Sequence, residues 1–254
     1  MKFLTVKTLL TIGVLSLSAL GQSSFASENA IKSAIDNPQR PQTDRDKDDK
    51  RQPQQIIEFF KVQPATTVLD VLAGSGYYSE ILSRVVGEQG KVIIHNDKHF
   101  LKYYGENLSK RLEDGDRLAN TVRMDISLND LELEENSVDT IFLILGYHDF
   151  FYIMSEAEKI NVTKVLAKFK KFLKPDGIIG IVDHEAMVGA PSSVGGTLHR
   201  IDPAIVKSQM AEAGFTLDGE LPILQNNTDD KSQKIWDIPG GMTSRFVLRF
   251  KNNK

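Results

Sequence analysis

The chain has 254 residues, of which 41% are hydrophobic and 26% are charged, as expected for a globular protein with one large domain. Its formal net charge is −3 and its basic residues form no block, which argues against a nucleic-acid partner. The sequence has no cysteine, so disulfides and thiolate metal sites are excluded.

The N-terminus has the layout of a secretory signal. Two lysines precede an uncharged apolar run at residues 9–20, and the small residues Ser24 and Ala26 stand where a signal peptidase reads the chain. The run is shorter than the roughly 20 residues that a membrane helix needs. We therefore expect residues 1–26 to be a cleaved signal peptide, and the protein to be exported to the periplasm with no stable membrane span. An uncleaved anchoring helix is the alternative.

Residues 27–53 form a polar N-terminal arm that is too charged for a core of its own. Composition favours a solvated linker over an arm that lies against the domain and closes a site. Periodic structure begins after Pro53, where apolar residues predict a short helix. The folded domain is therefore predicted at residues 54–254.

Strands and helices alternate through this domain. A capping box at Ser155 and Glu158 begins the helix after the fourth strand, and residues 174–177 predict a turn. The pattern predicts an α/β fold with a mostly parallel sheet covered on both faces. The last two strands have no helix between them, which predicts an antiparallel hairpin. The expected strands are residues 67–72, 91–95, 121–124, 138–145, 178–182, 215–221 and 246–250.

A glycine-containing loop follows the first strand. Asp70 stands four residues before Gly74, and Gly76 follows. Ligands of open α/β sheets bind at the carboxyl ends of strands, where glycine lets the backbone approach them closely. A dinucleotide fingerprint needs Gly or Ala at position 79, which is Ser79 here. The pattern favours S-adenosylmethionine (SAM) over a nicotinamide, with its methionine part on Gly74, Ser75 and Gly76 and with Asp70 behind. A tight turn without a ligand is the alternative.

The ends of the second and third strands carry further candidates for the cofactor. Asn96 or Asp97 is expected to hold the ribose, because a carboxylate can accept hydrogen bonds from both hydroxyls. Asp125 is expected to accept a hydrogen bond from the adenine amine, and Ile126 to pack against the ring. For each of these residues, a solvated strand end or loop is the alternative.

A methyl acceptor is expected beside the end of the fourth strand. His148 is the candidate catalytic base, because histidine has a pKa close to neutrality. A histidine that only forms structural hydrogen bonds is an equally weighted alternative. Its neighbours Tyr147 and Asp149 are candidates for the substrate side of the site.

Further substrate-side candidates are His184, just past the fifth strand, and His199 with Arg200, which precede a helix. The run Asp183-His184-Glu185 suggests a metal site at first sight. Adjacent residues at a strand end point in alternate directions, however, so we expect no metal.

Together these segments make the chain resemble class I SAM-dependent methyltransferases, and more closely a family of predicted exported bacterial methyltransferases. The resemblance covers roughly residues 38–251. The matching segments are Arg40-Pro41, Asp44-Arg45-Asp46, Arg51-Gln52-Pro53, residues 68–71, residues 74–82, residues 146–149, residues 173–177, residues 198–202, Ala213-Gly214-Phe215 and residues 246–250.

The resemblance implies a Rossmann-like fold with seven strands, SAM as the cofactor, and an arm that belongs to the domain. It departs from the general class at Leu72, where glycine is frequent, and at Asn96, which occupies the place of the ribose acid. The leading hypothesis is methyl transfer to a small or envelope-associated acceptor. Alternatives are a non-catalytic exported binding protein that reuses the fold and, less favoured, a nicotinamide-dependent oxidoreductase.

Overall fold

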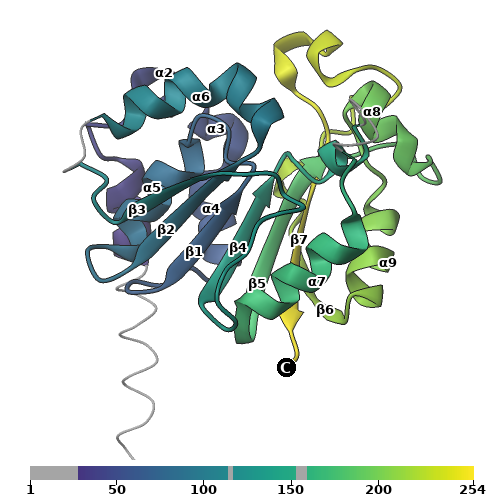
Figure 1. Ribbon diagram of the computed structural model, residues 1–254. Helices are drawn as coiled ribbons and strands as arrows, with labels where there is room; N and C mark the ends of the chain where they lie inside the picture. The colour runs from purple at the N-terminus through teal and green to yellow at the C-terminus, as the bar shows by residue number, and fades with distance from the viewer. Residues whose placement is uncertain (1–27, 114–116, 153–158) are drawn as a thin grey trace, which may run out of the picture.

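The computed structural model of the protein describes residues 28–113, 117–152 and 159–254. A seven-stranded sheet in the order β3-β2-β1-β4-β5-β7-β6 forms its centre (Figure 1). Only β7 runs opposite to the other six strands, which confirms the predicted α/β fold with a C-terminal antiparallel hairpin. The strands are β1 (Thr67–Val71), β2 (Lys91–Asn96), β3 (Thr121–Asp125), β4 (Val138–Ile144), β5 (Leu173–His184), β6 (Phe215–Glu220) and β7 (Arg245–Asn252).

Helices cover both faces of this sheet, with α7 and α9 on one face and α4 and α5 on the other (Figure 1). In the described part of the chain, no helix has both the length and the hydrophobicity needed to cross a bilayer. The α-helices are α2 (Gln42–Arg45), α3 (Asp48–Arg51), α4 (Pro53–Phe59), α5 (Tyr77–Val86), α6 (Lys98–Leu112), α7 (Val162–Phe172), α8 (Gly195–Leu198) and α9 (Pro203–Glu212). Short 3-10 turns include η1 (His148–Phe151) and η5 (Ile235–Asp237).

The apolar core has two halves, one on each face of the sheet. Neighbouring residues of a strand point to opposite faces, so Leu69 and Val71 of β1 join the half under α7 and α9. Val68 joins the half under α4 and α5. Strands buried on both faces read as continuous apolar runs, which explains why the sequence revealed them.

The N-terminal arm packs against the domain. Ile31 and Ala34 are buried in the core half that contains α4 and α5. Arg40 is 2% exposed and forms two hydrogen bonds with Asp48, at 2.7 and 2.8 Å. The hydroxyl of Tyr77 on α5 donates to the same carboxylate at 2.5 Å. This position agrees with what the resemblance implies, rather than with the linker that composition favoured.

One predicted element is not tested by the structure, and one differs from it. The capping box at Ser155 and Glu158 lies outside the described residues, and the described helix α7 begins at Val162. The turn predicted at residues 174–177 forms an irregularity within β5 and does not precede it. Along β4, Val138 pairs with Leu173 and Thr140 already pairs with Ile178, so the turn is looped out of the ladder.

Candidate active site

The loop after β1 has a backbone that requires glycine. Gly74 and Gly76 have φ angles of +59° and +82°, in the left-handed region that side chains disfavour. Asn96 at the end of β2 fixes the loop from one side: its Oδ1 accepts from the Gly74 N–H at 2.8 Å, and its Nδ2 donates to the Gly74 carbonyl at 2.9 Å. Arg111 Nε donates to the Ser75 carbonyl at 2.6 Å from the other side.

Asp70 lies behind this loop and borders neither of the cavities described below. It is 2% exposed, and its Oδ2 accepts a hydrogen bond from the Ser79 hydroxyl at 2.6 Å. Burial raises the pKa of Asp70 to about 7, although the Ser79 bond and the charge of Arg51 oppose the shift. Its contact with α5 gives it a role in supporting the loop.

Side chains of α6 lie over the glycine loop. A Cβ atom at Gly74 would be 3.6 Å from the ring of Tyr104. A Cβ atom at Gly76 would be 3.1 Å from both Leu108 and Arg111. The Tyr104 ring, which is 43% exposed, therefore borders the space over Gly74.

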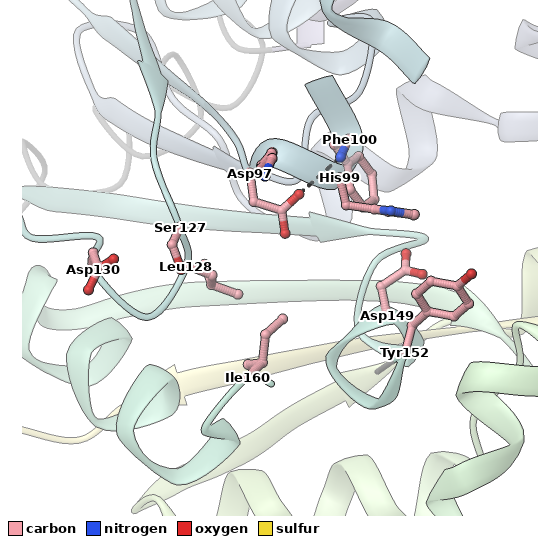
Figure 2. A pocket seen from close by; sticks show the side chains of 10 residues that line it. Asp97, His99, Phe100, Ser127, Leu128, Asp130, Asp149, Tyr152 and Ile160 are labelled. Atoms are coloured by element: carbon pink, nitrogen blue, oxygen red, sulfur yellow. Dashed lines mark hydrogen bonds between the residues drawn. The ribbon is translucent and has the colours of Figure 1, made fainter. Parts of the chain in front are cut away.

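Two cavities open at the carboxyl edge of the sheet. The smaller has a volume of about 240 Å³ and the larger about 440 Å³, and they share His99, Phe100, Asp149 and Tyr152. The smaller is also lined by Asp97, Lys98, Ser127, Leu128, Asp130 and Ile160 (Figure 2). The larger is also lined by Tyr103, Tyr104, Leu145, His148, His184, His199, Ile235 and Trp236.

Of the two ribose candidates, only Asp97 borders a cavity. Its Oδ1 accepts a hydrogen bond from Phe100 N at 3.0 Å and so caps α6, while its other oxygen points into the smaller cavity (Figure 2). Asn96 is completely buried, and its amide is used by the Gly74 backbone.

The two adenine candidates lie beside the smaller cavity without lining it. Asp125 accepts two hydrogen bonds from Arg123 Nε, at 2.8 and 2.9 Å. Ile126 is partly buried against the core. The residues that border the cavity are the next two along the chain, Ser127 and Leu128.

The end of β4 brings a group of histidines and carboxylates together at the larger cavity. His148 Nδ1 lies 2.6 Å from Asp183 Oδ1 at the end of β5, and the backbone N–H of His148 donates to the other oxygen at 2.8 Å. His148 Nε2 lies 3.2 Å from His199 Nδ1 and 3.4 Å from Asp149 Oδ1. His199 Nδ1 lies 3.6 Å from the same oxygen.

Charge and burial set the protonation of this group. Burial opposes the charged form of His148, but the neighbouring Asp183 outweighs it and raises the pKa of the imidazole. Burial also opposes the charged form of Asp183, yet His148 holds the pKa of that carboxyl low. Burial raises the pKa of Asp149 to about 6, although His148 lowers it. Burial and the charge of His148 lower the pKa of His199 to about 4.

The other substrate-side candidates divide into two kinds. His184 lines the larger cavity, and its Nδ1 lies 2.7 Å from the Thr243 hydroxyl. Tyr147 is fully buried, and its hydroxyl donates to Gln209 at 2.7 Å. Arg200 is also fully buried and forms two hydrogen bonds with Asp229, at 2.8 and 2.9 Å. Tyr147 and Arg200 border neither cavity, and their contacts are structural.

Sequence reasoning missed the aromatic wall around His199. Its ring lies 4.8 Å from the Trp236 ring and 5.3 Å from the Tyr152 ring, and Tyr152 lies 5.2 Å from His99. Trp236 is part of the short turn η5, where the sequence has no hydrophobic periodicity, so no pattern placed it. One signal was available for His99: histidines are few in this chain, and most of them, His99 included, follow the end of a predicted strand.

Comparisons with known proteins agree with this fold. A family model described as protein-L-isoaspartate(D-aspartate) O-methyltransferase matches residues 17–123, which include the glycine loop but not β4. No curated protein matches the chain. A SAM-dependent methyltransferase from Aquifex aeolicus superposes with a TM-score of 0.58 at 21% identity, covering 88% of this chain and 97% of that one.

Two further solved structures show how varied the proteins with this fold are. Geranyl diphosphate C-methyltransferase from Streptomyces coelicolor A3(2), solved with Mg²⁺, geranyl-S-thiolodiphosphate and S-adenosyl-L-homocysteine, has a TM-score of 0.59 and 10% identity over 87% of this chain and 84% of that one. The [4+2]-cyclase SpnF has a TM-score of 0.56 and 12% identity over 80% and 81%. The chain therefore has the Rossmann-like class I methyltransferase fold.

Proposed function

We propose that the protein is a SAM-dependent methyltransferase that acts on a small or envelope-associated acceptor. The supporting observation is that the glycine loop, the free oxygen of Asp97 and two adjoining cavities lie along one edge of the sheet. From β1 the chain adds strands β2 and β3 on one side of the sheet, and then β4 and β5 on the other side. Open α/β sheets bind ligands at such a switch point, here between β1 and β4. The combined space suits a small-molecule site of several hundred Å³.

The residues of this edge fit the three parts of SAM. The left-handed loop at Gly74 and Gly76 has backbone without side chains for the methionine part, although both glycines are buried under α6 and line neither cavity. The free oxygen of Asp97 points into the smaller cavity, where it can accept a hydrogen bond from a ribose hydroxyl. Phe100 and Leu128 supply apolar walls for the adenine. Asp125 and Ile126 line neither cavity: Asp125 is paired with Arg123, and Ile126 packs against the core cluster that contains Leu128.

The larger cavity is the proposed acceptor site. When bound, SAM supplies a methyl group on a positively charged sulfur. The protein must then orient the acceptor in line with that bond and remove its proton. His148 is placed for proton removal, because Asp183 accepts from Nδ1 and leaves Nε2 beside His199 and Asp149 at the wall of the cavity. The acceptor is then an alcohol, phenol or amine small enough for about 440 Å³.

A second candidate function is that of an exported binding protein that reuses this fold without catalysis. The observation that favours it is the closeness of α6 to the glycine loop, where Tyr104 and Arg111 occupy positions next to the backbone. The likeness to the cyclase SpnF also shows that the fold is compatible with an activity other than methyl transfer. In this case the two cavities would hold another metabolite.

Calorimetric titration with SAM and S-adenosyl-L-homocysteine tests the proposal. We expect micromolar binding, about −8 kcal/mol. Asp97→Asn keeps the helix cap but removes the charge, and is expected to bind SAM about tenfold or more weakly. Glu106→Gln on the exposed face of α6 removes the same charge and is the matched control. A folded protein that binds neither compound contradicts the proposal and favours the second candidate.

We also propose export with cleavage before Ser27. The predicted signal, residues 1–26, lies outside the described residues. The proposal rests on its charged start, apolar run and small residues at the cleavage site. N-terminal sequencing of protein from the cell envelope is expected to begin at Ser27, and a chain that begins at Met1 would contradict cleavage.

A further inference from the structure

Three donor atoms at the wall of the larger cavity form a compact triangle. They are His148 Nε2, His199 Nδ1 and Asp149 Oδ1, and the three separations are 3.2, 3.4 and 3.6 Å. Metal–ligand distances of about 2.0–2.2 Å place the ligand atoms of a tetrahedral ion about 3.3–3.6 Å apart. The triangle therefore has the size that a first-row divalent ion requires of three of its ligands.

The chain folds so that two adjacent residues can converge on one point. His148 and Asp149 belong to the 3-10 turn η1, where the alternation of a strand does not apply. The third donor arrives from α8, which lies tightly against η1: a Cβ atom at Gly195 would be 2.4 Å from the His148 carbonyl. His199 ends α8 with a left-handed φ of +54°, an uncommon conformation that is often found at functional sites.

The surroundings of His148 supply the second feature of a metal site. A ligating histidine normally gives the proton of its other ring nitrogen to a carboxylate or carbonyl, which fixes the tautomer and orients the ring. Here Asp183 is fully buried and accepts from His148 Nδ1 at 2.6 Å. This leaves the lone pair of Nε2 for the triangle. The same carboxylate bonds the His148 backbone N–H, which holds the ring in place.

We propose that His148, Asp149 and His199 bind one divalent transition-metal ion, of which Zn²⁺ is the natural occupant for two imidazoles and one carboxylate. Three protein ligands leave a coordination position open, as in catalytic rather than structural sites. All three residues line the larger cavity, so this position faces it. The proposal revises the expectation of no metal, which considered only residues 183–185.

A bound ion would change how the acceptor loses its proton, a consequence that rests on the proposed function. An oxygen that coordinates a divalent ion is far more acidic than a free alcohol or phenol. With His148 as a ligand, its imidazole would no longer remove the proton of the acceptor. Coordination to the ion would make the acceptor oxygen acidic enough to lose that proton. The site then favours an acceptor with an oxygen able to bind the ion.

Metal titration of the purified protein after treatment with a chelator tests the site. We expect one equivalent of Co²⁺ to produce the visible absorption of a four- or five-coordinate ion, and Zn²⁺ to displace it. His199→Ala and Asp149→Ala are expected to weaken Zn²⁺ binding at least 100-fold, and Asp183→Asn about 10- to 100-fold. His184→Asn is the matched control. His184 lines the same cavity, but its Nδ1 contacts the Thr243 hydroxyl and not the donor triangle, so Zn²⁺ binding should not change.

Two outcomes would overturn the proposal. One is a folded wild-type protein, by circular dichroism, that takes up neither Co²⁺ nor Zn²⁺, which would leave the triangle as a hydrogen-bonded histidine pair. The other is stoichiometric binding that survives His199→Ala and Asp149→Ala. Because metal uptake is measured without SAM, a chain that binds Zn²⁺ but not SAM contradicts the proposed methyltransferase and leaves the metal site standing.

Discussion

Asn96 and Gly74 are joined by two reciprocal hydrogen bonds between one side-chain amide and one backbone residue, at 2.8 and 2.9 Å. The pair connects the ends of the parallel neighbours β1 and β2, and both residues are buried. An amide does here what a carboxylate cannot, since a carboxylate has no donor for the Gly74 carbonyl. The asparagine therefore supports the glycine loop, and the neighbouring Asp97 is left to face the cavity.

The first prediction concerns this pair. Asn96→Ala leaves the Gly74 N–H and carbonyl buried without a partner, and is expected to lower the free energy of unfolding by about 1–3 kcal/mol for each group. Urea unfolding measures the loss. Asn107→Ala, at an exposed position of α6, is the control and should change stability by less than about 0.5 kcal/mol. Equal stability of the two variants would show that the loop does not depend on Asn96.

The sequence was sufficient for the sheet because local patterns specify it. Apolar runs and turn residues predicted the mostly parallel sheet, and the missing helix between the last two strands predicted the hairpin. The roles of Asn96 and His199 depend instead on contacts between distant segments. Asn96 meets Gly74 through the register of β1 and β2, and His199 meets His148 because α8 packs on η1. No local pattern encodes such distances, so Trp236 and the donor triangle remained hidden.

The second prediction is a pH dependence that comes from Asp70. Burial raises the pKa of this carboxyl from 3.8 to about 7, so the folded state keeps a proton that the unfolded chain releases. The protonated carboxyl of Asp70 therefore stabilises the folded state. This contribution to the free energy of unfolding is fully present below pH 4 and is lost as pH rises to 7, at about 1.4 kcal/mol per pH unit. The difference in unfolding free energy between wild type and Asp70→Asn should follow this slope.

Asp44→Asn provides a control of opposite sign. Burial opposes ionisation of Asp44, but Arg111 and Lys47 lower the pKa of its carboxyl below 3.8. Its contribution to stability is therefore present above pH 4 and is lost as the solution becomes more acidic. If the difference in unfolding free energy between wild type and Asp70→Asn does not change between pH 4 and 7, Asp70 is ionised in the folded protein.

The third prediction concerns how closely α4 packs on the sheet. A Cβ atom at Gly180 in β5 would be 2.2 Å from the ring of Phe60, which is fully buried. Gly180→Ala should therefore destabilise the fold by about 1–3 kcal/mol through overpacking. Gly105→Ala in α6 is the matched change, because its Cβ meets nothing nearer than 3.6 Å. It should stabilise the protein by up to about 1 kcal/mol. Thermal unfolding of both variants gives the comparison.

The last prediction concerns Arg111, which ties the arm to the glycine loop. Its three guanidinium nitrogens donate to Ser75 O, Glu80 and Asp44, and its side chain is 7% exposed. Arg111→Met removes the charge that Asp44 and Glu80 share in the interior. The free energy of unfolding should fall by about 3–5 kcal/mol, because buried carboxylates lose a partner.

Lys110→Met is the matched control for this change. Lys110 is the preceding residue of α6, and its ion pair with Glu106 is exposed, so its loss should leave the free energy of unfolding nearly unchanged. Limited proteolysis reports on the arm independently of the rest of the domain. Cleavage within residues 28–53 should accelerate in Arg111→Met and not in Lys110→Met. If the arm stays protected in both variants, its attachment depends on Arg40, Asp48 and Tyr77 instead.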